Sequence, residues 1–92
     1  MLKIEFTSKM KRDVKRMQKR GCSLAKLEEV LNLLVERNPL PLKNRDHQLK
    51  GGKKDFRECH IEPDWLLIYK VSEDRLILSA IRTGTHSDLL DM

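Results

Sequence analysis

The sequence predicts an α+β fold in which a mainly antiparallel sheet carries two helices on one of its faces. A strand-like alternation occupies residues 1–6, two amphipathic helical segments follow, and three strand-like runs come after residue 55. Because both helices come from a single insertion after the first strand, they must form one layer on one face, which leaves the other face for a partner. A chain of 92 residues has the size of one domain, which we expect to span 1–92.

The first strand and the first helix follow from two hydrophobic periods. The apolar positions of the strand alternation are Leu2, Ile4 and Phe6. Thr7 and Ser8 can then cap a helix that runs to Arg20, because their hydroxyls accept from the free N–H groups of its first turn. The apolar side of this helix is formed by Met10, Val14 and Met17. The rest of the helix is strongly basic, and Gly21 is a natural stop for it.

A second helix begins after Ser23, which we expect to cap it, and ends at Asn38-Pro39. Its wide apolar stripe consists of Leu24, Leu27, Val30, Leu31, Leu34 and Val35. The link between the two helices is short, which favours an antiparallel helix hairpin.

Residues 38–54 are rich in prolines, glycines and basic residues, so they are expected to form a loop, with a short strand possible around 47–49. The three strands expected after this loop are 56–61, 65–71 and 75–82. Turn sequences separate them, which indicates an antiparallel meander. The run 65–71 is apolar at both alternating sets of positions, which is typical of a central strand.

The charge distribution indicates an anionic partner. The net charge is +5, and residues 1–57 hold 16 of the 19 Lys and Arg but only 7 of the 14 acidic residues. Nucleic acid, a ribosomal surface or an acidic protein fits this asymmetry, and a merely solvated basic surface is the alternative. Cys22 and Cys59 match no metal or disulfide spacing. We see no signal peptide and no apolar run long enough for a membrane, so we expect a cytoplasmic protein with reduced thiols.

Three histidines, His47, His60 and His86, each lie near other polar groups that can take part in chemistry. His60 precedes Asp64 by four residues, and His86 follows Arg82 by four. Cleavage of RNA without a metal or cofactor needs a base for the ribose 2′-hydroxyl, an acid for the departing 5′-oxygen and a cation for the phosphate. Imidazole, with an unperturbed pKa of about 6.5, suits the first two roles, and a guanidinium suits the third.

Other residues are candidates for RNA binding. Trp65 suits base stacking and core packing equally well, because a tryptophan at the start of a strand can do both. Lysines near Gly51-Gly52 can approach a phosphate backbone and give affinity that does not depend on sequence. These lysines are Lys50, Lys53 and Lys54, with Lys43 and Arg45 on the same loop.

The segments DHQLKG, HIEPDWLLIYK and RTGTHSDLL together resemble the YafQ-type toxins of the RelE superfamily, the ribosome-dependent mRNA interferases of type II toxin–antitoxin systems. The resemblance extends over nearly the whole chain. It implies a RelE-like fold, cleavage of mRNA in the ribosomal A site, contact with ribosomal RNA and neutralisation by a cognate antitoxin protein.

By position, the resemblance implies specific roles. The site residues of the family fall on His47, His60, Asp64, Trp65, Arg82 and His86. His86 is then the general acid, Arg82 binds the phosphate, and the base is Asp64 or one of the other histidines. An aromatic residue that is usual near the C-terminus of the family is replaced by Leu90 here, which leaves an apolar contact in place of base stacking.

Two other functions are open on the sequence alone. A non-catalytic RNA-binding or ribosome-associated module would use the basic surface and not the histidines. A zinc hydrolase would use the histidines as ligands, although no short ligand spacing occurs.

Overall fold

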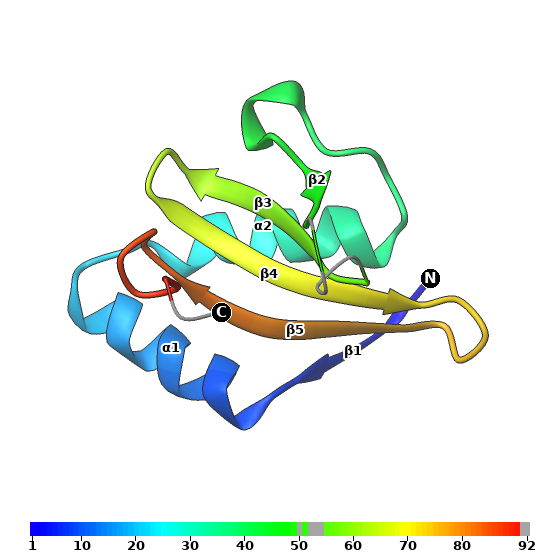
Figure 1. The fold of residues 1–92 in the computed structure, drawn as a ribbon, viewed down its shortest axis with the longest axis horizontal. Helices are drawn as coiled ribbons and strands as arrows, with labels where there is room; N and C mark the ends of the chain where they lie inside the picture. The colour runs from blue at the N-terminus through cyan, green and yellow to red at the C-terminus, as the bar shows by residue number, and fades with distance from the viewer. Residues whose placement is uncertain (50, 52–54, 91–92) are drawn as a thin grey trace.

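The computed structural model describes residues 1–49, 51 and 55–90. Among these residues, two helices and five strands follow one another in the expected order, and a 3-10 turn, η1, lies in the loop (Figure 1). The elements are β1 (Lys3–Phe6), α1 (Ser8–Lys19), α2 (Leu24–Val35), η1 (Leu42–Asn44), β2 (His47–Gln48), β3 (Arg57–Glu62), β4 (Trp65–Ser72) and β5 (Ile77–Gly84).

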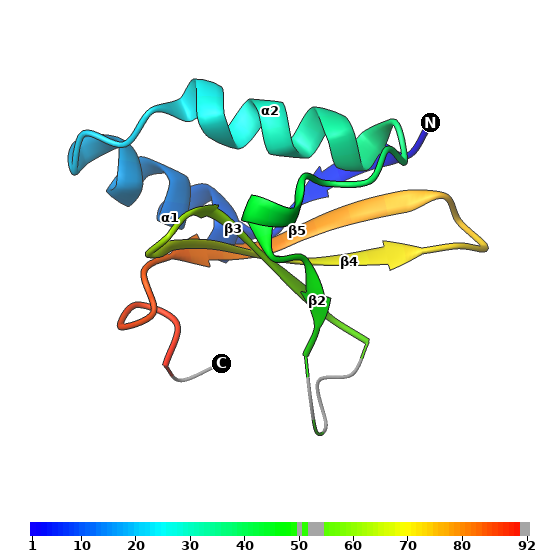
Figure 2. The same ribbon diagram turned by 90° about the horizontal axis from the view of Figure 1, so that it is seen from above.

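The strands form one sheet in the order β1-β5-β4-β3-β2. Strand β1 pairs with β5 in parallel, and every other pair is antiparallel. Both helices lie on one side of this sheet, and the chain reverses its direction between them (Figure 2). The prediction of a mainly antiparallel sheet with two helices on one face is therefore confirmed, and so is the short extra strand at His47. We call the side without helices the open face.

Helix α1 begins and ends where the sequence indicates. The Thr7 hydroxyl accepts from the Met10 N–H at 2.9 Å, and Gly21 continues the chain with a left-handed φ of 87°. Met10 and Met17 are buried against the sheet. Asp13 is buried beside them, on the side of the helix that packs against the sheet. A carboxylate there needs partners that compensate its lost hydration.

Helix α2 is the less accurately predicted of the two. Ser23 occupies the N-cap position, as predicted, but its side chain makes no hydrogen bond to the first turn. The helix ends at Val35, before Asn38-Pro39, because Arg37 adopts a left-handed φ of 61°. The Arg37 and Asn38 N–H groups then bond back to carbonyls of the last turn at 3.0 and 2.9 Å, which satisfies those acceptors.

Strand β4 is buried on both sides, as its sequence predicts. Its helix-facing side packs into the main core together with α1, α2 and β5. Its other side packs into a smaller apolar cluster on the open face, formed by Leu66, Ile68 and Leu89 with Leu49, Phe56 and Ile81 around them. The tail after β5 and the segments that flank β2 thus cover part of the open face. Within the residues that the structure describes, no helix is long and apolar enough to cross a bilayer.

Candidate active site

The strand register places most of the predicted site residues on the open face. Residues directly opposite in neighbouring strands share one face of the sheet. One such row crosses four strands as His47, Glu58, Ile68 and Arg82. The next row contains His60, Leu66 and Gly84. Because Leu66 and Ile68 belong to the apolar cluster of the open face, the strand positions of both rows belong to that face, although a long side chain such as that of Arg82 can still reach α1 around the edge of the sheet.

A β-bulge in β5 is the reason why Arg82 belongs to this face. Ala80 opposes Tyr69 and Arg82 opposes Ile68, so Ile81 is an extra residue without a partner in the register. Strict alternation from Ala80, which packs in the helix-side core, would direct Arg82 to that core as well. The bulge shifts the alternation by one residue and turns Arg82 toward the open face.

Two histidines, one from β3 and one from the segment after β5, lie side by side at one end of the sheet. The ring of His60, in β3, and the ring of His86, directly after β5, have centroids 5.7 Å apart and an interplanar angle of 53°. This separation is about twice the length of a hydrogen bond. Two ring nitrogens at this spacing can therefore reach two oxygens of one phosphate group between them.

His60 is held in one orientation. Its Nδ1 lies 3.2 Å from the Pro63 carbonyl oxygen, and its own carbonyl accepts from the Asn44 side-chain amide at 2.6 Å. The residue is only 8% exposed. A carbonyl can only accept, so Nδ1 must carry the proton of this bond. In the neutral ring, Nε2 then carries the lone pair and can act as a base.

His86 has a charged partner in place of a carbonyl. Asp64 Oδ1 accepts from both the backbone N–H of His86 at 3.0 Å and its Nδ1 at 2.5 Å. These two bonds, the backbone one first, hold the pKa of Asp64 below its usual value. The carboxylate therefore fixes the orientation of the ring through Nδ1, and Nε2 is the ring nitrogen left to meet a substrate.

The turn that carries His86 is built around Asp88. Its carboxylate accepts from the Thr85 N–H at 2.9 Å and from Arg20, at the end of α1, at 2.6 and 3.2 Å. The Arg20 bond, followed by the Thr85 bond, lowers the pKa of Asp88 well below its usual value. Gly84 makes room for this turn, because a Cβ there would lie 2.9 Å from the Asp88 Cβ. Helix α1 thus anchors the loop that presents His86.

His47 lies on the same face but outside the pair. Its diagonal distance from His60 in the register corresponds to about 7–8 Å between backbones. Its Nδ1 contacts the Arg45 carbonyl at 2.7 Å, and its Nε2 lies 3.4 Å from Glu58 Oε1. Both ring nitrogens of His47 therefore already face protein oxygens.

The strand that bears His47 is anchored by the preceding residue, Asp46. The Tyr69 hydroxyl donates to Asp46 at 2.5 Å, and Arg57 contacts the same carboxylate at 3.2 Å. Burial and this bond raise the pKa of Tyr69.

Arg82 has a partner that the sequence analysis did not identify. Its Nε and one terminal nitrogen donate to the two oxygens of Asp13 at 2.7 and 3.1 Å. The Arg82 side chain is 13% exposed. A cavity of about 340 Å³ beside it is lined by Lys9, Arg12, Asp13, Arg16 and Arg82.

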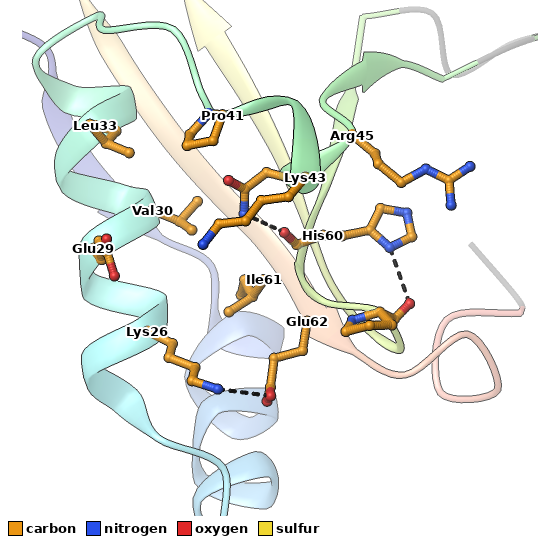
Figure 3. Close-up of a pocket in the computed structure, with 12 residues that line it drawn as sticks. Lys26, Glu29, Val30, Leu33, Pro41, Lys43, Arg45, His60, Ile61 and Glu62 are labelled. Atoms are coloured by element: carbon orange, nitrogen blue, oxygen red, sulfur yellow. Dashed lines mark hydrogen bonds and ion pairs between the residues drawn. The ribbon is translucent and has the colours of Figure 1, made fainter.

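A second cavity borders His60 but does not include His86. Its volume is about 530 Å³, and it lies between α2, η1 and β3. Figure 3 shows Val30 and Ile61 lining it, while the His60 ring extends away from α2 toward Arg45. Among the described residues, no group of three or more His, Cys, Asp or Glu side chains is placed to hold a metal ion.

Comparison with known proteins identifies the family. A sequence model of YafQ, a bacterial toxin of type II toxin–antitoxin systems, matches residues 2–91. The chain belongs to the YafQ toxin family. It is 42% identical over 87 residues to the mRNA interferase toxin YafQ of Escherichia coli strain K12, which covers 94% of this chain and 92% of that protein.

Solved structures of YafQ relatives share the fold. The toxin in the E. coli DinJ-YafQ complex matches with a TM-score of 0.88 and 40% identity, over 97% of this chain and 98% of that one. A metal-bound toxin from Helicobacter pylori matches with a TM-score of 0.92 and 45% identity, over 97% and 99% of the two chains.

The structure corrects the expectation that Trp65 is an RNA contact. Trp65 is 2% exposed and lies in the helix-side core, so a base cannot stack on it. Its indole N–H donates to the Thr83 hydroxyl at 2.8 Å, which in turn donates to the Leu66 carbonyl. Leu90 is 83% exposed and remains available for an apolar contact. The other RNA contacts expected on this chain, Lys50, Lys53 and Lys54, lie outside the described residues.

Two carboxylates near the site were missed although the sequence contains signals for them. Asp13 falls at helical spacing between Met10 and Met17, so it shares their buried side. Asp88 follows Thr85 by three residues, the offset at which a hydroxyl and a carboxylate bond reciprocally to each other's backbone N–H.

Proposed function

We propose that this chain is an endoribonuclease toxin that cleaves translated mRNA by metal-independent acid–base catalysis. The observation that carries the proposal is the pair of histidine rings 5.7 Å apart on the open face. Membership of the YafQ family supports it, because an E. coli relative is named as an mRNA interferase. The pair joins two groups of the type that RNA cleavage requires, at a spacing that fits one phosphodiester.

His60 is the general base in this proposal. Its Nδ1–H is engaged by the Pro63 carbonyl, so Nε2 is the ring nitrogen that can accept a proton. Nε2 takes the proton of the ribose 2′-hydroxyl. The 2′-oxygen then forms a bond to phosphorus, and the bond from phosphorus to the 5′-oxygen breaks. The products are a 2′,3′-cyclic phosphate and a free 5′-hydroxyl.

His86 is the general acid. Asp64 accepts from its Nδ1 and orients the ring, and Nε2 gives its proton to the departing 5′-oxygen. This assignment makes Asp64 an orienting partner of His86 and not the base. Arg82 supplies positive charge to the phosphate as negative charge develops on it. His47 and Leu90 contact nucleotides beside the scissile bond.

The partners proposed here follow from charge and family. The ribosome presents mRNA in its A site and so supplies orientation that a small open face lacks. The basic surface of α1 docks on ribosomal RNA, and Lys50, Lys53 and Lys54 contact phosphates. A cognate antitoxin neutralises the toxin, as the name of the E. coli DinJ-YafQ toxin–antitoxin complex suggests for that relative. Translated mRNA places this activity in the cytoplasm.

The test is cleavage of a defined mRNA on purified ribosomes, with and without a chelator. We expect the wild type to cut in the presence of the chelator, and His60→Ala and His86→Ala each to lose about 10²–10⁴-fold in rate. Retained fold is checked by thermal unfolding. Cleavage that a chelator abolishes would contradict the metal-independent mechanism. RNA affinity without any cleavage, unchanged in a variant that lacks all three histidines, would identify a non-catalytic RNA-binding module instead.

A further inference from the structure

A buried charge on helix α1 needs an explanation. Asp13 is 3% exposed and lies on the helix side that packs against the sheet. A carboxylate buried in this way costs stability unless several donors satisfy it. Four hydrogen bonds reach Asp13, from Arg16 at 2.8 Å, from Arg82 at 2.7 and 3.1 Å, and from the Thr83 N–H at 3.2 Å. It is therefore fully engaged, and its main partners lie 69 and 70 residues away in the sequence.

The two residues that Asp13 holds in β5 follow the bulge directly. The bulge turns Arg82 away from the core, and the two bonds from its guanidinium to Asp13 then fix the direction of a long and flexible side chain. Arg16 contacts the same carboxylate, so the three groups together stay positive and attractive to a phosphate.

The same carboxylate also supports the histidine end of the site. The Thr83 N–H donates to Asp13, and the Thr83 hydroxyl accepts from the Trp65 indole. Trp65 directly follows Asp64, and Thr83 lies three residues before His86. This buried chain of bonds thus joins α1 to the strand ends that carry Asp64 and His86.

We propose that Asp13 is a positioning residue for RNA cleavage, which holds the Arg82 guanidinium where the scissile phosphate binds. The inference depends on the proposed nuclease function, and it adds a residue that touches neither substrate nor reacting atoms. A misplaced cation stabilises the transition state less, because the geometry of the charged group decides its effect. Asp13→Asn keeps the shape of the side chain but removes the charge that holds both donors of Arg82.

The test is a double-mutant cycle between Asp13 and Arg82, measured as ribosome-dependent cleavage at saturating and limiting substrate. We expect Asp13→Asn to lower kcat by about 10²-fold with a small change in KM. In the Arg82→Ala background, the same substitution should lower the rate by clearly less than about 10²-fold, because the guanidinium that Asp13 holds is gone and only the bond to the Thr83 N–H remains to be lost. Glu73→Gln is the control. It removes an exposed carboxylate that pairs with Arg37 far from the site, and this variant should cut at the wild-type rate.

A second test, hydrogen exchange at the Arg82 guanidinium, uses only the wild-type protein and therefore does not require that any variant folds. The Nε–H of Arg82 should exchange with water more slowly than the Nε–H of Arg12, an exposed arginine on helix α1. Equal exchange rates would overturn the proposal, and so would a folded Asp13→Asn that cuts like the wild type. A full effect of Asp13→Asn in the Arg82→Ala background would overturn it as well. A wild type that does not cut RNA would instead refute the nuclease function, while slow exchange would still report the Asp13–Arg82 contact.

Discussion

Histidines on the open face lie in two different surroundings. In the histidine pair, His86 is held by Asp64 through Nδ1 and faces a second imidazole, that of His60. On the neighbouring strand β2, His47 is held by the Arg45 carbonyl through Nδ1 and faces Glu58 through Nε2. An imidazole can pass a proton to substrate only if one ring nitrogen meets substrate. The comparison therefore teaches that the group facing Nε2 distinguishes a histidine that can react with substrate from one that only supports the site.

The largest expected effect tests this difference directly. His60→Ala and His86→Ala should each slow cleavage by about 10²–10⁴-fold, whereas His47→Ala should cost less than about tenfold, because only the paired rings are proposed to transfer protons. Single-turnover cleavage of one mRNA on ribosomes measures all three variants side by side. If His47→Ala is as slow as the other two, the distinction between the histidine pair and His47 is wrong.

A smaller loss is expected when the turn that carries His86 is displaced. The Cβ added by Gly84→Ala would lie 2.9 Å from the Asp88 Cβ, so the turn must move away from the strand end. We expect a loss of roughly tenfold in cleavage rate and about 1–3 kcal/mol in the free energy of unfolding. Gly51→Ala is the matched control on the loop after His47, because none of the described atoms lies within 4 Å of the added Cβ, although its φ of 73° adds local strain. Wild-type cleavage by Gly84→Ala would show that His86 does not need this turn.

Replacement of the tryptophan sharpens the contrast between the two faces. Trp65→Phe removes a buried indole N–H and its bond to Thr83, which should cost about 1–2 kcal/mol in the free energy of unfolding. RNA affinity should stay unchanged, because this side chain faces the helices. Urea unfolding and an RNA-binding titration measure the two quantities. A loss of affinity in a protein of unchanged stability would restore the base-stacking role that the structure excludes.

The smallest effect concerns stability in acid. Asp88 and Asp64 have pKa values below those of unfolded carboxylates, so their stabilisation is complete above about pH 4 and is lost as the pH falls through the folded values. The free energy of unfolding should thus decrease between about pH 4 and pH 2. In Asp88→Asn this decrease should be shallower, with the whole curve lower at neutral pH. An unchanged slope would show that Asp88 does not contribute.

The spacing of apolar residues along the sequence predicts the helices and strands of this protein well, because each face of such an element is exposed either to the core or to solvent. The continuous apolar run of β4 and the spacing of Met10 and Met17 on α1 sufficed to place both elements. The faces of Trp65 and Arg82 could not be predicted in the same way. Trp65 begins a strand whose two sides are both apolar, and Arg82 follows a bulge that shifts the alternation by one residue.

The contacts that complete the site depend on pairs far apart in the chain. Asp13 meets Arg82 across 69 positions, and Arg20 meets Asp88 across 68. Composition and spacing contain no information on such pairings, because tertiary packing alone brings α1 beside the end of β5. The family resemblance indicated which residues belong to the site. Only the register shows that they share one face, with His47 at a distance from the pair.

The pH dependence of single-turnover cleavage tests the central assignment most directly. If His60 is the base and His86 the acid, the wild-type rate should fall at both low and high pH. The residual activity of His60→Ala should lose the fall at low pH, and that of His86→Ala should lose the fall at high pH. The opposite pattern would exchange the two roles. Two falls that persist in both variants would contradict the account, because the proton transfers would then belong to other groups.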